Sequence, residues 1–211
     1  MTKPHNNSRG TKQVRKGEQA GINAWLKHNI SPDTPAVFFT LKFHRRAFLD
    51  LGGRQTISET KAETLLNLWL NRLDRTQGTK RDLKRGKRIE RVVFKHSGYT
   101  GENIHYHGVI LATANSKKLL NDARRFWLDL IAESNGWVDA TRSHIEIATD
   151  TNDAAYYSAH EVWKLGAEDS WCLWQTHMPN DGVAIAKKEQ EQRWKRTAQL
   201  RELRLCRERQ E

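Results

Sequence analysis

Two histidines on a predicted strand are the residues whose types and spacing are best suited to chemistry. Residues 104–111 read IHYHGVIL, so that one residue separates His105 from His107. Side chains two apart on a strand point to the same face, roughly 6.6 Å apart along the chain. The two imidazoles could therefore bind one divalent ion, although such a pair alone is weak evidence because it is usually only a pair of polar strand positions.

The preceding strand supplies a third candidate ligand, His96. It is followed by the turn-rich sequence SGYTGE at 97–102, which is typical of a β-hairpin. Antiparallel pairing would bring His96 close to the other two histidines, and three imidazoles leave coordination positions open for a substrate oxygen and water. Glu102 is an alternative third ligand. His144 and Glu146 repeat the spacing on a later strand without a third partner, so we interpret them as structural or peripheral.

A tyrosine on a polar helix face is the candidate nucleophile. Residues 150–164 predict a helix on which Tyr157 shares a face with His160, Glu161 and Lys164. Neighbouring cations favour the phenolate form, and a bound metal ion can polarise a phosphate that the phenolate attacks. The alternative interpretation is an exposed aromatic residue without a role.

The phase of this helix decides between two adjacent tyrosines. Ala155, Ala159 and Val162 form an apolar stripe that should face the sheet, and this phase directs Tyr157 to the polar side. A helix rotated from this phase would present Tyr156 instead, and that alternative stays open.

The charge balance predicts a polyanionic partner. Lysine and arginine number 36 against 25 aspartates and glutamates, which gives a net charge of +11. Neutralising phosphates releases counterions, so a nucleic acid is the expected partner. Residues 79–91 are the densest basic segment and are equally compatible with a solvated loop and with a phosphate-contacting arm. The candidate nucleic-acid-binding residues are Lys80, Arg81, Lys84, Arg85, Lys87 and Arg88.

Several classes of protein are not expected. No apolar run approaches the ~18–20 residues of a membrane span, and residues 1–16 are basic without a following apolar block, unlike a secretory signal. We therefore expect a cytoplasmic protein. Cys172 and Cys206 are far apart, which disfavours a disulfide framework or a thiolate zinc site. Any metal ion must use histidine and carboxylate ligands, and the absence of a P-loop means that helicase activity would come from a partner.

The elements that must position these residues alternate between strands and helices. We expect a basic flexible tail at 1–17, a helix and linker at 18–35, the catalytic domain at 36–165, and an irregular segment with a basic helix at 166–211. The order predicts an α+β fold with a central antiparallel sheet flanked by helices. The expected strands are 36–43, 89–96, 103–112 and 137–148, and the expected helices 18–28, 59–73, 116–134 and 150–164.

The order of three motifs resembles the HUH endonucleases, particularly the rolling-circle replication initiators of plasmids, phages and small single-stranded DNA viruses. The motifs are FFTL at 38–41, IHYHGVI, and a tyrosine-bearing helix about 50 residues later, within residues 36–164. The resemblance implies a ferredoxin-like or RRM-like sheet. It also implies His105 and His107 as ligands of Mg²⁺ or Mn²⁺, a third ligand at His96, and Tyr157 attacking DNA to leave a 5′-phosphotyrosine and a free 3′-OH.

The chain departs from the family pattern at two positions. The family commonly has lysine three residues after the tyrosine, where this chain has His160, with Lys164 one turn further. Many relatives have a carboxylate at the position of His96. His160 and Lys164 are therefore both candidates for contacting the scissile phosphate.

The resemblance also implies partners and alternatives. The expected substrate is single-stranded or stem-loop origin DNA, with a separate helicase and polymerase. A transposase or a relaxase is the alternative within the superfamily, although small transposases often carry glutamine where this chain has Glu161, and relaxases a longer histidine cluster. A non-catalytic, RRM-like nucleic-acid-binding module is the alternative of another class.

Overall fold

The computed structural model describes residues 8–44, 46–48, 54–98, 103–112, 115–178, 191–192 and 195. The chain divides into two units, Met1–His177 and Met178–Glu211. In the second unit the described residues are Met178 and three helical residues, with an ion pair between Lys195 and Glu191 (2.8 Å). The rest of the basic helix predicted within 166–211, and Cys206, lie outside the described residues.

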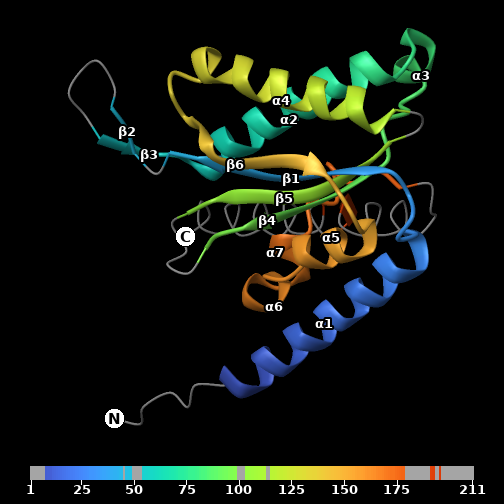
Figure 1. The fold of residues 1–211 in the computed structure, drawn as a ribbon. Helices are drawn as coiled ribbons and strands as arrows, with labels where there is room; N and C mark the ends of the chain where they lie inside the picture. The colour runs from blue at the N-terminus through green and yellow to red at the C-terminus, as the bar shows by residue number, and fades with distance from the viewer. Residues whose placement is uncertain are drawn as a thin grey trace, which may run out of the picture. The chain divides into compact units, whose positions relative to one another are not determined.

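The first unit is built on a four-stranded antiparallel sheet, which confirms the predicted α+β class. Its strands are β1 (Ala36–Phe43), β4 (Arg91–His96), β5 (His105–Leu111) and β6 (Val138–Ile147), in the spatial order β4-β5-β1-β6. The helices α2 (Glu59–Gln77) and α4 (Ser116–Glu133) follow β1 and β5 and cover one face (Figure 1). This βαββαβ order is that of a ferredoxin-like core.

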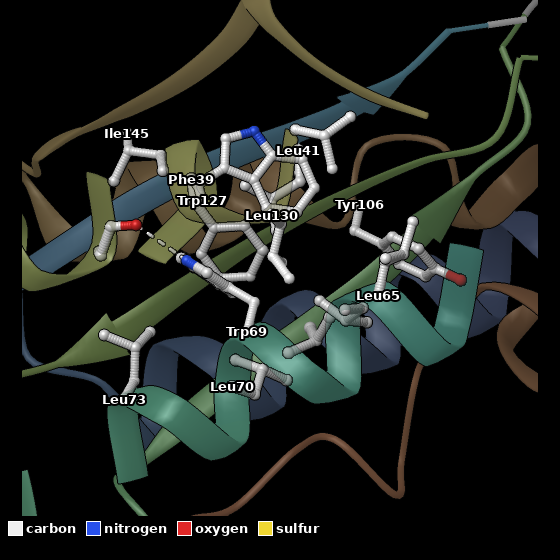
Figure 2. Packing of buried hydrophobic residues seen from close by; sticks show 14 of the residues in the cluster. Phe39, Leu41, Leu65, Trp69, Leu70, Leu73, Tyr106, Trp127, Leu130 and Ile145 are labelled. Atoms are coloured by element: carbon white, nitrogen blue, oxygen red, sulfur yellow. Dashed lines mark hydrogen bonds between the residues drawn. The ribbon is translucent and has the colours of Figure 1, made fainter. Parts of the chain in front are cut away.

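The hydrophobic core lies between the sheet and these two helices. Alternate residues of β1 point toward the helices, where the Phe39 ring meets Trp69 edge-on at 5.0 Å between centroids. Trp127 of α4 lies against Trp69, whose indole nitrogen donates to the Ala123 carbonyl (2.9 Å), as Figure 2 shows. The residues that alternate with these along the strands point to the other face of the sheet, where the candidate site lies.

Local signals fix the start of α2. Ser58 caps the helix by accepting from the Lys61 amide, as its sequence position predicts. The helix continues to Gln77, beyond the predicted end at residue 73, where the buried Asp74 accepts from the Arg91 guanidinium (2.6 and 3.1 Å). Arg91, the last residue of the basic segment, is therefore a buried structural residue.

Shorter helices cover the second face of the sheet. They are α5 (Thr151–Ser158), α6 (Val162–Leu165) and α7 (Ala167–Ser170), and α1 (Ser8–Asn29) packs against them (Figure 1). The prediction of a flexible tail was wrong for residues 8–17, which are helical. Arg15 donates to the Lys164 carbonyl (2.7 Å) and Glu18 accepts from the Ala167 amide (3.0 Å), tertiary contacts that local polarity does not reveal.

Two further elements were not expected as structure. A small hairpin is formed by β2 (Arg46–Phe48) and β3 (Arg54–Thr56), and α3 (Lys80–Lys84) lies in the basic segment. Residues 171–177 line the outer edge of β4, where the Arg91 amide donates to the His177 carbonyl (2.7 Å). Among the described residues, no helix is long and apolar enough to cross a membrane.

Candidate active site

Three histidines from two adjacent strands converge on the sheet face opposite the core. His96 of β4 lies directly across from His105 of β5, and His107 follows two residues along the same strand. The His96 ring centroid is 5.3 Å from that of His105 and 4.3 Å from that of His107. One ligand nitrogen from each histidine lies within 4.8 Å of the others. The structure therefore brings together the three residues selected as metal ligands from the sequence.

Hydrogen bonds outside the cluster occupy one ring nitrogen of each histidine. His96 Nε2–H donates to the Ser158 carbonyl (2.7 Å) and His105 Nδ1–H donates to the Asn103 carbonyl (2.7 Å), because a carbonyl can only accept. His107 Nδ1 lies 3.0 Å from the Thr40 hydroxyl. Metal-binding histidines usually have their second nitrogen held in this way, which leaves the other lone pair for the ion.

Burial keeps the three imidazoles neutral. Desolvation is the main cause that lowers the pKa of each of the three histidines, to about 3 for His96. Nearby histidines lower the pKa of His96 and that of His107 further. The neutral form is the one that donates a lone pair to a metal ion. The cluster is therefore in its ligating form at neutral pH.

Glu161 is a site residue whose role sequence reasoning missed. Its Oε2 atom is buried without a hydrogen-bond partner and lies 3.8 Å from His96 Nδ1, which also lacks one. Lys164 donates to the other carboxylate oxygen (2.7 Å). Burial raises the pKa of Glu161, but this ion pair outweighs burial and lowers the pKa overall. Two orphaned acceptors facing each other fit a bound cation.

Tyr157 lies beside the histidine cluster. Its side chain is 54% exposed, and its ring centroid is 5.4 Å from that of His107 and 5.8 Å from that of Phe38. Tyr156 is half-buried, and Ala155 and Ala159 are fully buried, as the predicted helix phase requires. The phenol is therefore both accessible and adjacent to the cluster.

The helix that carries Tyr157 is shorter than predicted. Instead of one helix over 150–164, α5 ends at Ser158 and a turn leads to α6. The amides of Ala159, His160 and Val162 bond to carbonyls three residues back, which tightens the chain. His160 stacks on the Tyr157 ring (4.7 Å), as residues three apart on a helix can, and the turn brings Glu161 beside His96.

The two basic candidates at the end of this segment differ in position. His160 joins the site, with its ring centroid 4.6 Å from that of His96, and its Nδ1–H donates to the Tyr157 carbonyl. Among the described residues, Lys164 contacts the site through its ion pair with Glu161. In this conformation Lys164 positions a carboxylate, while His160 is the basic residue beside the phenol.

The structure does not bring the basic segment to this site. Its residues precede Arg91 at one end of β4, whereas His96 is at the other end, about 17 Å away at the usual strand rise. Lys87 pairs with Asp82 (3.7 Å) and Arg88 with Asp74 (3.5 Å). The exposed basic residues of the segment are Lys80, Arg81, Lys84, Arg85 and Lys87. A contact between this segment and a phosphate at the cleavage position is not supported.

The remaining candidates lie outside the cluster. Glu102 lies outside the described residues. His144 and Glu146 are exposed on β6 and line a cavity that also includes Tyr157. Comparisons of the chain with protein-family models, curated proteins and solved structures gave no match. The functional argument therefore depends on the geometry of the site.

Proposed function

We propose that this protein is a metal-dependent, single-strand DNA nickase and ligase of the HUH type that initiates rolling-circle replication of a plasmid, phage or related element. The observation that carries the proposal is the convergence of three buried, neutral imidazoles with an exposed tyrosine, Tyr157. Such an enzyme would work in the cytoplasm and use a helicase and a polymerase from elsewhere.

The ligand set fits a divalent metal ion. His96, His105 and His107 would hold the ion, with Glu161 as an anionic neighbour, and the unpartnered His96 Nδ1 and Glu161 Oε2 atoms support this assignment. An imidazole-rich site favours Mn²⁺ over Mg²⁺, because Mg²⁺ prefers oxygen ligands. When bound, the ion supplies charge neutralisation at a non-bridging phosphate oxygen.

The residues of the chain account for the rest of the reaction. Tyr157 Oη forms a bond to phosphorus while the bond to the 3′ oxygen breaks, and the phenolic proton leaves to solvent through the exposed side of the ring. The 3′ oxygen takes a proton from water and becomes the free 3′-OH. Because the phosphodiester is replaced by a phosphotyrosine ester, the reverse attack by a 3′-OH rejoins the strand.

A covalent-adduct assay tests the proposal. Wild-type protein is incubated with Mn²⁺ and a pool of labelled single-stranded oligonucleotides, and denaturing gels reveal labelled protein. We expect an adduct that chelation prevents, that Tyr157→Phe abolishes, and that the matched variant Tyr156→Phe retains. Oligonucleotide binding without an adduct under all ions and sequences would instead support a non-catalytic nucleic-acid-binding module, and an adduct lost only in Tyr156→Phe would assign the nucleophile to Tyr156.

A further inference from the structure

A cavity beside the proposed nucleophile has an unexpected lining. It has a volume of about 530 Å³, within the usual range for small-molecule sites, and is bounded by β1, β6 and α5. Among the described residues, no lysine or arginine lines it in a chain of net charge +11, whereas Glu146, Asp150 and Asp153 do. This lining is unsuited to phosphate and suited to a neutral group that donates hydrogen bonds.

Two aromatic residues, Phe38 and Tyr157, line the cavity. Phe38 of β1 is half-buried and lies edge-on to Tyr157, with 5.8 Å between ring centroids. Aromatic side chains provide stacking surfaces for unpaired bases. A base stacked on Phe38 would therefore be next to the phosphate that Tyr157 attacks.

A carboxylate lies beside Phe38 in the lining. Glu146 is the antiparallel partner of Phe38 across the β1–β6 pair, so their side chains share a face at a separation of about 5 Å between Cβ atoms. Glu146 is exposed, and Asp153 lies one helical turn before Tyr157 on α5. Asp150, by contrast, uses a carboxylate oxygen to cap α5 by accepting from the Asp153 amide (2.9 Å).

We infer that this cavity binds a guanine base flanking the cleaved phosphodiester, with Phe38 stacking on the base and Glu146 accepting from its Watson–Crick edge. Guanine offers two adjacent donors there, N1–H and N2–H₂, which match the two oxygens of one carboxylate. Cytosine and adenine offer one amino group, and thymine one N–H flanked by carbonyls that a carboxylate repels. The inference depends on the proposed function in placing the base next to the cleaved bond.

Binding of defined oligonucleotides tests the inference without catalysis. The probes are short fluorescent oligothymidylates that carry a single guanine, cytosine or adenine at each position in turn. On a Tyr157→Phe background, we expect guanine at one position to tighten binding about tenfold over thymine, the scale of a bidentate base contact. Glu146→Gln should remove most of this advantage.

A charge-matched variant separates base recognition from general electrostatics. Asp129→Asn removes one exposed carboxylate on α4, away from the cavity. It should tighten binding of all probes by a similar small factor and leave the guanine advantage intact. The inference is wrong if guanine helps at no position or if its advantage survives Glu146→Gln. A DNA adduct without guanine preference would reject this inference alone, and guanine preference without any adduct would reject the nickase alone.

Discussion

Thr40 determines which nitrogen of His107 is available for a metal ion. Its hydroxyl lies 3.0 Å from His107 Nδ1 in a buried position, so Nδ1 is occupied and Nε2 is the nitrogen left for a metal ion. The Thr40→Val variant keeps the shape of the side chain but removes this bond. Because neighbours of metal ligands typically contribute 10–100-fold to metal affinity, we expect a loss of about tenfold or more in Mn²⁺ affinity by calorimetric titration.

The matched control is Thr141→Val, which changes an exposed threonine on β6. It should leave Mn²⁺ affinity unchanged. Equal affinity in wild type and Thr40→Val would mean that Thr40 does not orient His107 for a metal ion.

The buried histidines predict a pH-dependent stability of the metal-free protein. The pKa of His96 falls to about 3 in the folded chain because of burial, whereas an unfolded histidine titrates near 6.5. Below pH 6.5 the unfolded state binds a proton that the folded state rejects, so stability is lost as the pH falls from 6.5 toward 3. Each such histidine contributes a slope of up to about 1.4 kcal/mol per pH unit.

Urea unfolding of the chelated protein at several pH values measures this slope. His96→Gln should flatten it, and the exposed-site variant His144→Gln should not. A free energy of unfolding that is equal at pH 7.5 and pH 5 would contradict the neutral, buried state of the cluster.

At the scale of elements, Gly108 lets β5 approach the core. A Cβ atom at this position would lie 2.4 Å from the Phe39 ring and 2.4 Å from the Val92 carbonyl oxygen. Gly108→Ala should therefore destabilise the protein by about 1–3 kcal/mol or more in urea unfolding. Gly21→Ala, in α1 with nothing within 4 Å, should instead be neutral or stabilising. Equal effects of the two variants would contradict the packing of β5 against Phe39.

The ion pair between Asp74 and Arg91 joins α2 to β4. Both side chains are buried, and the Arg91 guanidinium also donates to the Gln175 carbonyl (2.9 Å). Asp74→Ala leaves a buried, unpaired cation and should lower the free energy of unfolding by about 3–5 kcal/mol. A loss below about 1 kcal/mol, the value of a surface pair, would show that Arg91 reaches solvent.

Elements formed by local interactions could be predicted from the sequence, whereas those that depend on tertiary packing could not. The bounds of β1 and the cap of α2 were predicted because apolar runs and Ser58 are local signals. The grouping of His96 with His105 and His107 could be predicted from the sequence, because hairpin pairing brings His96 opposite His105. The turn after Ser158, and with it the place of Glu161 beside His96, depends on packing against the sheet and carries no local sequence signal.

At the scale of the whole molecule, the basic segment at 79–91 lies apart from the candidate active site. The interpretation of residues 79–91 as a phosphate-contacting arm used composition, and composition does not specify where such an arm lies relative to the active site. The topology places α3 beside α2, at the end of β4 remote from His96. The exposed residues Lys80 and Arg81 could bind only DNA that extends beyond the site.

Neutralising this segment should weaken DNA binding without changing the formation of the covalent adduct. Replacing Lys80, Arg81, Lys84 and Arg85 with alanine should leave the adduct yield on a short oligonucleotide unchanged. It should weaken binding of longer single strands and reduce the salt slope by about 0.7 for each lost phosphate contact. A lost adduct on the short substrate, measured beside binding by anisotropy, would contradict the separation.

The most direct test of the central claim is the mass of the peptide that carries DNA after reaction. The protein is incubated with Mn²⁺ and a cleaved oligonucleotide, digested with protease and nuclease, and sequenced by mass spectrometry. The account predicts a 5′-nucleotide phosphate on Tyr157, formed only with metal and absent when His105 or His107 is alanine. A phosphate on another residue, or an adduct formed equally without metal or without these histidines, would contradict it.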